Sequence, residues 1–196
     1  MIINILDCEW LTWSLKSNYN ELYRKKNQKK EIIQIGILKT DIKKNKILSK
    51  KNIYIKPYFS KKVPKRIIKL TGISDKILKK KGVEFNIAYK QLIKFIKKHP
   101  TITNGGDEKV IKYNCSLNRI NSKELKSKKF YNYRNFLKRI IKKKDLSTNN
   151  LIKIFNLKGF YSVHNALTDC LIIKNSIIQL KSTKRYFNNF KKFINV

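Results

Sequence analysis

Hydrophobic residues occur along this chain as short runs and stripes separated by lysine-rich segments. The first run, from Ile2 to Leu6, is almost unbroken and favours a strand buried on both faces over an amphipathic helix. Isoleucines alternate with other residues over 31–40 and again over 47–56, which predicts two further strands. Because their connections are short, these three segments predict an antiparallel meander.

The rest of the chain combines helical stripes with short extended runs. The clearest helix is 84–99, in which Phe85, Leu92 and Ile96 share one face and lysines occupy the other. The whole pattern predicts an α/β fold, a mixed sheet of about five strands flanked by helices, in which parallel strands follow the meander. Further helices are expected over 64–70, 74–78, 107–117, 133–141, 148–155 and 165–180, and short extended runs over 101–103 and 159–163.

Length and composition indicate one globular domain. With 196 residues the chain can bury a full core, and we expect a domain over 1–181 followed by a basic helix or tail over 182–196. No apolar run is long enough to cross a bilayer, and the first run lacks the basic start of a signal peptide. Three cysteines without metal-type spacing argue against a zinc module and fit free thiols in the cytoplasm.

The net charge of +35 points to a polyanionic partner. Lysine and arginine number 47 against only 12 acidic residues, and such a surface gains affinity for nucleic acid by displacing phosphate counterions. The alternative is that an AT-rich genome encodes many lysines, which agrees with their even spread along the chain. We expect a nucleic-acid partner, because so large a charge is hard to tolerate without one.

The scarcity of acidic residues makes those at the first strand conspicuous. Asp7 and Glu9 are two residues apart, so in a strand both side chains point the same way while Cys8 points the other way. No lysine precedes Lys16, so no nearby residue neutralises them. A divalent cation such as Mg²⁺ or Mn²⁺, which prefers oxygen ligands, would stabilise the pair. The alternative is a solvated acidic turn.

Two later acids, Asp107 and Asp169, lie near the starts of predicted helices. Asp107 comes after the short strand 101–103 and begins a helix, where an ordinary N-cap is an equally good explanation. Asp169 is the only acid of the helix expected over 165–180, and His164 precedes that helix. Because five positions separate His164 from Asp169, they cannot share a helical face, and the histidine must lie in the loop before the helix.

Together these motifs resemble those of the DEDDh exonucleases, the DnaQ-like or RNase T-like group of 3′-to-5′ exonucleases with a ribonuclease H-like fold. The resemblance covers about residues 1–180 and includes Asp7-x-Glu9, Asp107 and the run from His164 to Asp169. The segments 31–36 (EIIQIG) and 56–73 are most similar to the subgroup of the RNA-interference-enhancing and sporulation-inhibitor exonucleases. The middle motif departs from the family pattern, because Gly105-Gly106-Asp107 is one residue short and lacks a preceding aromatic residue.

The resemblance implies a two-metal mechanism with Mg²⁺ or Mn²⁺. Asp7 would bridge the two ions, Glu9 and Asp169 would complete one site, and Asp107 would support the other. His164 would act as the general base on the attacking water, for which its ordinary pKa near 6.5 is suitable.

The resemblance also assigns substrate contacts. Trp10 and Leu11 would lie against the terminal bases, although Trp10 fits a core position equally well. Homodimers occur among similar exonucleases, so a homodimer is one expectation.

The resulting hypothesis is a metal-dependent 3′-to-5′ exonuclease acting on single-stranded RNA or DNA ends. One alternative is a non-catalytic nucleic-acid-binding protein on the same fold, which the altered middle motif suggests. Another is a phosphatase or nucleotidase with acidic metal ligands, which the strong positive charge disfavours.

Overall fold

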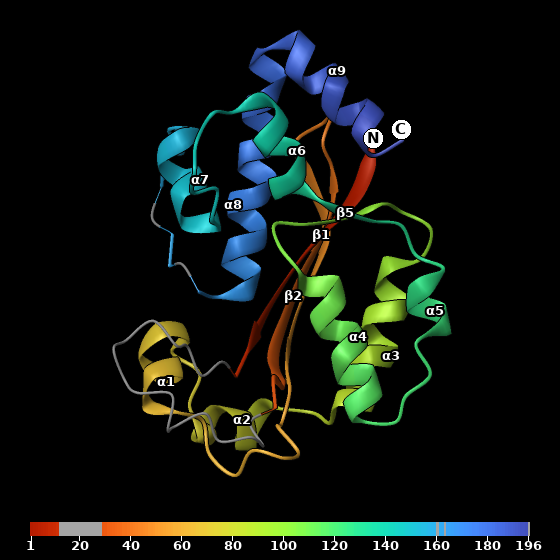
Figure 1. Cartoon of the computed structure of the whole chain (residues 1–196), viewed down its shortest axis with the longest axis vertical. Coiled ribbons are helices and arrows are strands. Elements are labelled where there is room, and N and C mark those ends of the chain that lie inside the picture. The colour runs from red at the N-terminus through yellow and green to blue at the C-terminus, as the bar shows by residue number, and fades with distance from the viewer. Residues whose placement is uncertain (12–28, 160, 163, 196) are drawn as a thin grey trace.

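In the computed structural model, which describes residues 1–11, 29–159, 161–162 and 164–195, the chain forms one five-stranded sheet covered by helices on both faces (Figure 1). The strand order is β3-β2-β1-β4-β5. The strands are β1 (Ile2–Trp10), β2 (Ile32–Asp41), β3 (Lys46–Tyr54), β4 (Thr101–Thr103) and β5 (Phe130–Asn132). The helices are α1 (Lys65–Thr71), α2 (Asp75–Lys81), α3 (Phe85–Ile96), α4 (Asp107–Leu117), α5 (Lys123–Lys126), α6 (Tyr133–Ile140), α7 (Thr148–Ile154), α8 (Ala166–Gln179) and α9 (Lys184–Phe193), with a 3-10 turn at Leu180–Ser182.

The sheet has the mixed topology expected from the sequence. β1, β2 and β3 form the antiparallel meander, and β4 and β5 add in parallel on the other side of β1. The prediction of an α/β fold with about five strands is therefore confirmed. β5 was not predicted, because a three-residue strand in the lysine-rich region 121–150 shows no alternation of its own.

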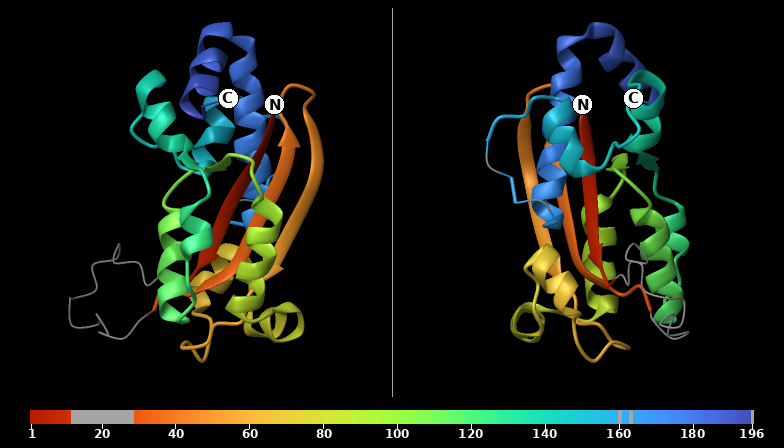
Figure 2. Two further views of the ribbon diagram at one scale, coloured as in Figure 1. Left: turned by 90° about the vertical axis from the view of Figure 1, so that its right-hand side faces the viewer. Right: turned by 60° about the vertical axis from the view of Figure 1, so that its left-hand side comes forward.

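Side chains along β1 point alternately to the two faces of the sheet, and each face is covered by its own layer of the core. Ile3 and Ile5 face α6, α7, α8 and α9, whereas Leu6 and Cys8 face α3, α4 and α5 (Figure 2). Asp7 continues the odd-numbered series, so it lies on the α8 face of the sheet. A third cluster of apolar side chains, which includes Leu11, Ile33, Val63, Ile67, Ile73 and Leu78, packs α1 and α2 against the end of the meander.

Most helices begin and end where the sequence indicates, with one clear exception. α3 ends at Ile96 instead of continuing to His99, because Lys97 adopts a positive φ of 48°. The amide of the fully buried Asn4 donates to the carbonyls of Ile96 and His99, which fixes this turn against β1.

The C-terminal helix α9 packs into the main core. Phe190 and Ile194 are fully buried, and the Phe190 ring packs edge-on against Tyr133 and Phe136 of α6. The division into a domain over 1–181 and a tail over 182–196 stays a prediction. No helix in the described part of the chain is long and apolar enough to cross a membrane. The expected extended run over 159–163 lies partly outside the described residues.

Candidate active site

The acidic residues of β1 lie where its neighbour β4 stops. β4 pairs with β1 only as far as Ile5, so the part of β1 that carries Asp7 and Glu9 has no ladder partner at that edge. The backbone N–H of Cys8, which points toward this gap, instead donates to the Asp107 carboxylate at 3.0 Å. Asp107 is the first residue of α4, directly after the turn that follows β4. Its carboxylate accepts the hydrogen bond that a backbone carbonyl of a neighbouring strand would otherwise accept. The sheet thus fixes three acids at one edge.

A close approach of helix to strand brings the fourth acid to the same place. Gly36 of β2 is the ladder partner of Asp7, and a Cβ on Gly36 would lie 2.3 Å from the carbonyl carbon of Ala166. The Gln34 side chain also accepts a hydrogen bond from the Ala166 N–H at 3.1 Å. Only glycine allows the first turn of α8 to rest on the sheet there, and this turn carries Asp169 toward Asp7.

His164 lies in the loop before α8, as the spacing predicts. Its φ of 61° is in the left-handed region, which reverses the chain just before the helix. The Asn165 side chain caps α8 by accepting from the N–H groups of Leu167 and Thr168, and the backbone N–H of His164 donates to the Asp169 carboxylate. Burial lowers the pKa of the His164 imidazole, which keeps it neutral and able to accept a proton near pH 7.

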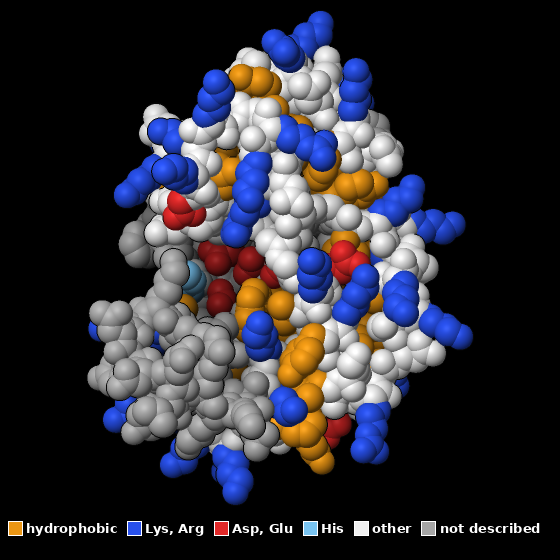
Figure 3. Space-filling view, viewed as in Figure 1, with side chains coloured by type: hydrophobic (Ala, Val, Ile, Leu, Met, Phe, Trp, Pro, Cys, Tyr) orange, Lys and Arg blue, Asp and Glu red, His pale blue; other side chains and the backbone are white. Residues whose placement is uncertain are grey.

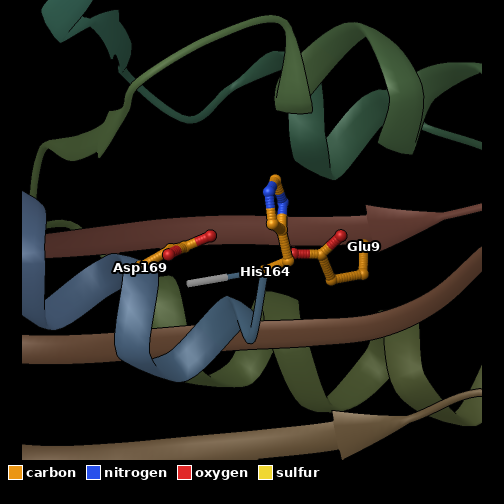
Figure 4. A group of neighbouring side chains, drawn as sticks. All are labelled: Glu9, His164 and Asp169. Atoms are coloured by element: carbon orange, nitrogen blue, oxygen red, sulfur yellow. The ribbon is translucent and has the colours of Figure 1, made fainter. Parts of the chain in front are cut away.

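Three of these side chains form a possible metal-binding group. One ligand atom each from Glu9, His164 and Asp169 lies within 4.8 Å of the others, and Figure 4 shows these side chains converging from β1 and the start of α8. With Asp7 and Asp107 beside them, the donor set is rich in carboxylate oxygen, which fits Mg²⁺ or Mn²⁺ better than softer metals.

The electrostatics of the four carboxylates also fit a cation. Burial, followed by repulsion from Asp107, Asp169 and Glu9, raises the pKa of Asp7 well above its ordinary value. Burial is likewise the main cause that raises the pKa of Glu9 to about 8, that of Asp169 to about 7 and that of Asp107 to about 6. None of the four forms an ion pair with a lysine or arginine of the described residues. One oxygen of Asp169 is buried without a hydrogen-bond partner there.

These residues line a cleft of about 540 Å³, which we call the acidic cleft. Figure 3 shows it as a hollow that holds acidic side chains, on a face otherwise studded with lysine and arginine. Trp10, Ile67 and Leu70 give it an apolar wall, in agreement with a substrate-facing position for Trp10. Leu11 does not line the cleft: it is fully buried in the cluster under α1 and α2, because the chain turns inward after β1 and the Leu11 N–H donates to the Glu31 carbonyl.

Sequence reasoning missed several polar residues of the cleft, among them Arg134 and Asn104. Arg134, in the first turn of α6, lines the cleft, and its positive charge counteracts the rise in the pKa of Asp7 and Asp107. Its Nε is buried without a hydrogen-bond partner among the described residues. Asn104 anchors the turn before α4 by donating to Leu146 and Thr148. Neither residue could be found from a motif, because β5 and α6 place Arg134 in the cleft only through tertiary structure.

Comparison with solved structures defines the fold class. The nuclease domain of 3'hExo, described as a DEDDh family member bound to rAMP, matches with a TM-score of 0.77 and 18% identity over 92% of each chain. Cell-death related nuclease 4 matches with a TM-score of 0.69 and 21% identity over 92% of this chain and 64% of that one. E. coli Exonuclease I in complex with a dT13 oligonucleotide matches with a TM-score of 0.74 and 11% identity over 96% of this chain and 43% of that one. The fold is therefore the ribonuclease H-like exonuclease fold.

The sequence itself gives the family. Residues 5–176 match the model of the RNase T exonuclease family, so this chain belongs to that family. The matched region begins in β1 and ends within α8, and it therefore contains every acidic residue of the cleft as well as His164. No curated protein matches the chain.

Proposed function

We propose that this protein is a metal-dependent exonuclease of the DEDDh type that removes nucleotides from the 3′ ends of single-stranded RNA or DNA. The observation that carries the proposal is that Asp7, Glu9, Asp107, His164 and Asp169, from three distant parts of the chain, line one cleft. Membership in the exonuclease family supports the reaction class, and the net charge of +35 supports a polyanionic substrate.

Each residue of the cleft has a role in this proposal. Two divalent ions, when bound, supply an activated water and stabilise charge on the attacking and leaving oxygens. Asp7 would serve both ions, Glu9 and Asp169 would hold one of them, and Asp107 would support the other. The neutral His164 imidazole takes the proton of the attacking water. His164 is suited to this task because its loop places it beside Glu9 and Asp169.

The cleft wall suits an unpaired strand end. Trp10 offers a ring on which a terminal base can stack without regard to sequence. Two of the structural matches were solved with nucleotide ligands, the mononucleotide rAMP in 3'hExo and the single-stranded dT13 oligonucleotide in Exonuclease I, which supports a nucleic-acid substrate here. The similarity of segments 31–36 and 56–73 favours the RNA-interference-enhancing and sporulation-inhibitor subgroup.

The test is degradation of 5′-labelled single-stranded RNA and DNA oligomers in Mg²⁺ or Mn²⁺. We expect a ladder that shortens from the 3′ end and is abolished by EDTA. Replacing the general base, His164→Ala, should lower the rate by about 10²- to 10⁴-fold, whereas His99→Ala, in the turn between α3 and β4 and outside the acidic cleft, should leave it unchanged. Products that shorten from the 5′ end, or an internal cleavage pattern, would contradict the proposal.

A non-catalytic nucleic-acid-binding protein is the competing function, favoured by the missing aromatic residue before Asp107. The position of Asp107 argues against it, since its carboxylate reaches Cys8 despite the shorter motif. Oligomers that are bound but intact in the parent protein and in His164→Ala alike would establish this alternative.

A further inference from the structure

A second cavity, of about 730 Å³, opens beside the loop that follows β3. The start of α3 and the end of α4 form its other walls. Its lining combines aromatic rings with positive charge: Lys56, Tyr58, Phe59, Phe85 and Arg119 face it, together with one carboxylate, that of Glu84. None of these residues belongs to the acidic cleft.

A buried carboxylate holds the loop of this cavity in place. Glu31 is only 4% exposed, and its two oxygens accept hydrogen bonds from the backbone N–H groups of Tyr58, Phe59 and Ser60 at 2.5, 2.9 and 2.7 Å. Three charge-assisted hydrogen bonds to consecutive N–H groups fix the backbone of a loop that otherwise lies at the surface. The two aromatic residues are therefore presented in a defined position.

The opposite wall is fixed to the same segment. Asn114 of α4 is 2% exposed, accepts from the Ile32 N–H at 3.1 Å and donates to the Lys30 carbonyl at 2.8 Å. Asn118 in turn donates to the Asn114 carbonyl, which fixes the end of α4 next to Arg119. Both walls thus depend on residues 30–32, so the cavity is formed before any ligand arrives.

The rings of this loop are exposed although they are large and apolar. Tyr58 is 81% exposed and Phe59 46%, and the two rings meet edge to face with centroids 4.9 Å apart. Exposed aromatic rings beside cations are the combination that binds unpaired bases, because each base has a π face and each phosphate a charge. The two cations, Lys56 and Arg119, outnumber Glu84, and the chain as a whole carries +35.

Backbone contacts connect this cavity to the acidic cleft. The Leu11 N–H donates to the Glu31 carbonyl at 2.9 Å, and Trp10 of the cleft wall pairs with Ile32. On the other side the loop leads directly into α1, which contributes Ile67 and Leu70 to the cleft. The acidic cleft and this cavity are therefore connected through the same two backbone segments, residues 10–11 and 31–32.

We propose that the Tyr58–Phe59 pair, with Lys56 and Arg119, is a second binding site for single-stranded nucleic acid, which holds the part of the strand upstream of its 3′ end. The inference deepens the proposed function, because it assigns the path of the same substrate. It predicts that strands long enough to reach the pair bind more tightly than strands that fill the cleft alone.

The test is binding of 5′-fluorescein-labelled single-stranded oligomers of 3 and 16 nucleotides, measured by fluorescence anisotropy in EDTA. We expect the double variant Tyr58→Ala/Phe59→Ala to bind the 16-mer about tenfold or more weakly than the parent, which is the usual effect of losing base stacking. Binding of the 3-mer should not change. Replacing the rings by Tyr58→Trp/Phe59→Trp should keep tight binding of the 16-mer.

Two controls identify the cause of any loss. Tyr186→Ala removes a ring of α9 that is 37% exposed at the far end of the molecule (Figure 1) and should leave both affinities unchanged. The double variant Lys56→Gln/Arg119→Gln should reduce the slope of log affinity against log salt by about 1.4 for the 16-mer, since each lost phosphate contact removes about 0.7. An alanine double variant that binds the 16-mer as the parent does would overturn the inference, and the cavity would then be open to another partner, such as a protein.

The measurement separates this inference from the proposed function. Because binding is measured without metal, it does not depend on hydrolysis. Tight, ring-dependent binding of the 16-mer without any hydrolysis in Mg²⁺ or Mn²⁺ would support the second site and contradict the exonuclease. Hydrolysis combined with 16-mer binding that does not depend on the Tyr58 and Phe59 rings would support the exonuclease and contradict the second site.

Discussion

The acidic cleft and the surface around it differ in whether their charged side chains have partners. Elsewhere in the described chain, several carboxylates have partners: Asp41 pairs with the N-terminal ammonium, Glu108 pairs with Lys112, and Glu31 accepts three backbone N–H groups. In the cleft, four of the chain's 12 acids lie together without an ion pair to any described lysine or arginine, although the chain has 47 such residues.

The difference shows that the fold keeps nearly all of its described cations out of the cleft, where Arg134 is the one lysine or arginine of the described residues in the lining. Two carboxylates at the edge of a core are unfavourable unless a cation joins them, and an abundance of lysine would ordinarily supply one. Here the positive charge stays on the outer surface, where it attracts a polyanion, and the negative charge is left for ions that come from solution. Each of the following predictions changes one side of this contrast.

The largest effect should come from Asp7→Asn, which removes the central charge of the cleft. We expect the rate of nucleotide release to fall by about three orders of magnitude or more, the scale on which catalytic electrostatic groups act. The affinity for single strands in EDTA should remain, because the basic surface is unchanged. Glu124→Gln, which removes an exposed acid of α5, is the matched control and should retain the parent rate.

The next effect should come from Gly36→Ala, which changes the cleft without changing its charge. The added Cβ would meet the backbone of Ala166 at 2.3 Å, so α8 must move away from β2 and take Asp169 with it. We expect a loss of activity of about a hundredfold, typical of a displacement near 1 Å, and a destabilisation of about 1–3 kcal/mol. Full activity of Gly36→Ala would show that the contact does not position Asp169.

A smaller effect is expected from Arg134→Gln, since Arg134 is a cation that reaches the cleft. Arg134 lines the cleft, so its guanidinium can meet a phosphate of the incoming strand. Losing such a hydrogen bond should raise KM by about 10- to 100-fold and change kcat less. Arg139→Gln, on an exposed position of the same helix, should leave KM unchanged. A fall in kcat with KM intact would instead give Arg134 a role in the chemical step.

The smallest effect concerns the stability of the metal-free protein. Because the pKa of Glu9 is raised to about 8 and that of Asp169 to about 7, the folded state favours their neutral forms. The stability that these groups contribute is complete below their unfolded pKa values near 4 and is lost as the pH rises toward 8. We expect the Tm in EDTA to fall between pH 5 and 8, and Mg²⁺ or Mn²⁺ to reverse the fall. A Tm that rises over this range in EDTA would contradict the assignment.

Much of the fold could be predicted from the sequence, because its elements repeat a pattern over several residues. The apolar run of β1, the isoleucines of β2 and the stripe of α8 are local signals that burial confirms, whereas β3 buries only Ile53. β5 lacked such a signal, since its three residues become a strand only by pairing with β4. The end of α3 depends on Asn4, which is 92 residues away from the carbonyl that it binds.

The residues of the candidate site likewise divide into those that a local sequence pattern indicates and those that only the tertiary structure reveals. Its acids and His164 could be predicted because their spacing forms motifs, and the structure brings all five together. Arg134 could not be predicted, because it reaches the cleft only through the packing of α6. Leu11 was assigned to the substrate because the resembled family uses the residues after the first-strand glutamate for this contact, but it is fully buried and packs under α1.

The central claim is that the acidic cleft binds divalent ions, and calorimetric titration with Mn²⁺ at pH 7.5 tests it most directly. The account predicts saturable binding of two ions per chain, accompanied by release of protons because the pKa values of Glu9 and Asp169 are raised. Asp7→Asn should abolish this binding, and Glu124→Gln should not affect it. Absence of saturable binding to the parent protein, or equal binding to Asp7→Asn, would contradict the account.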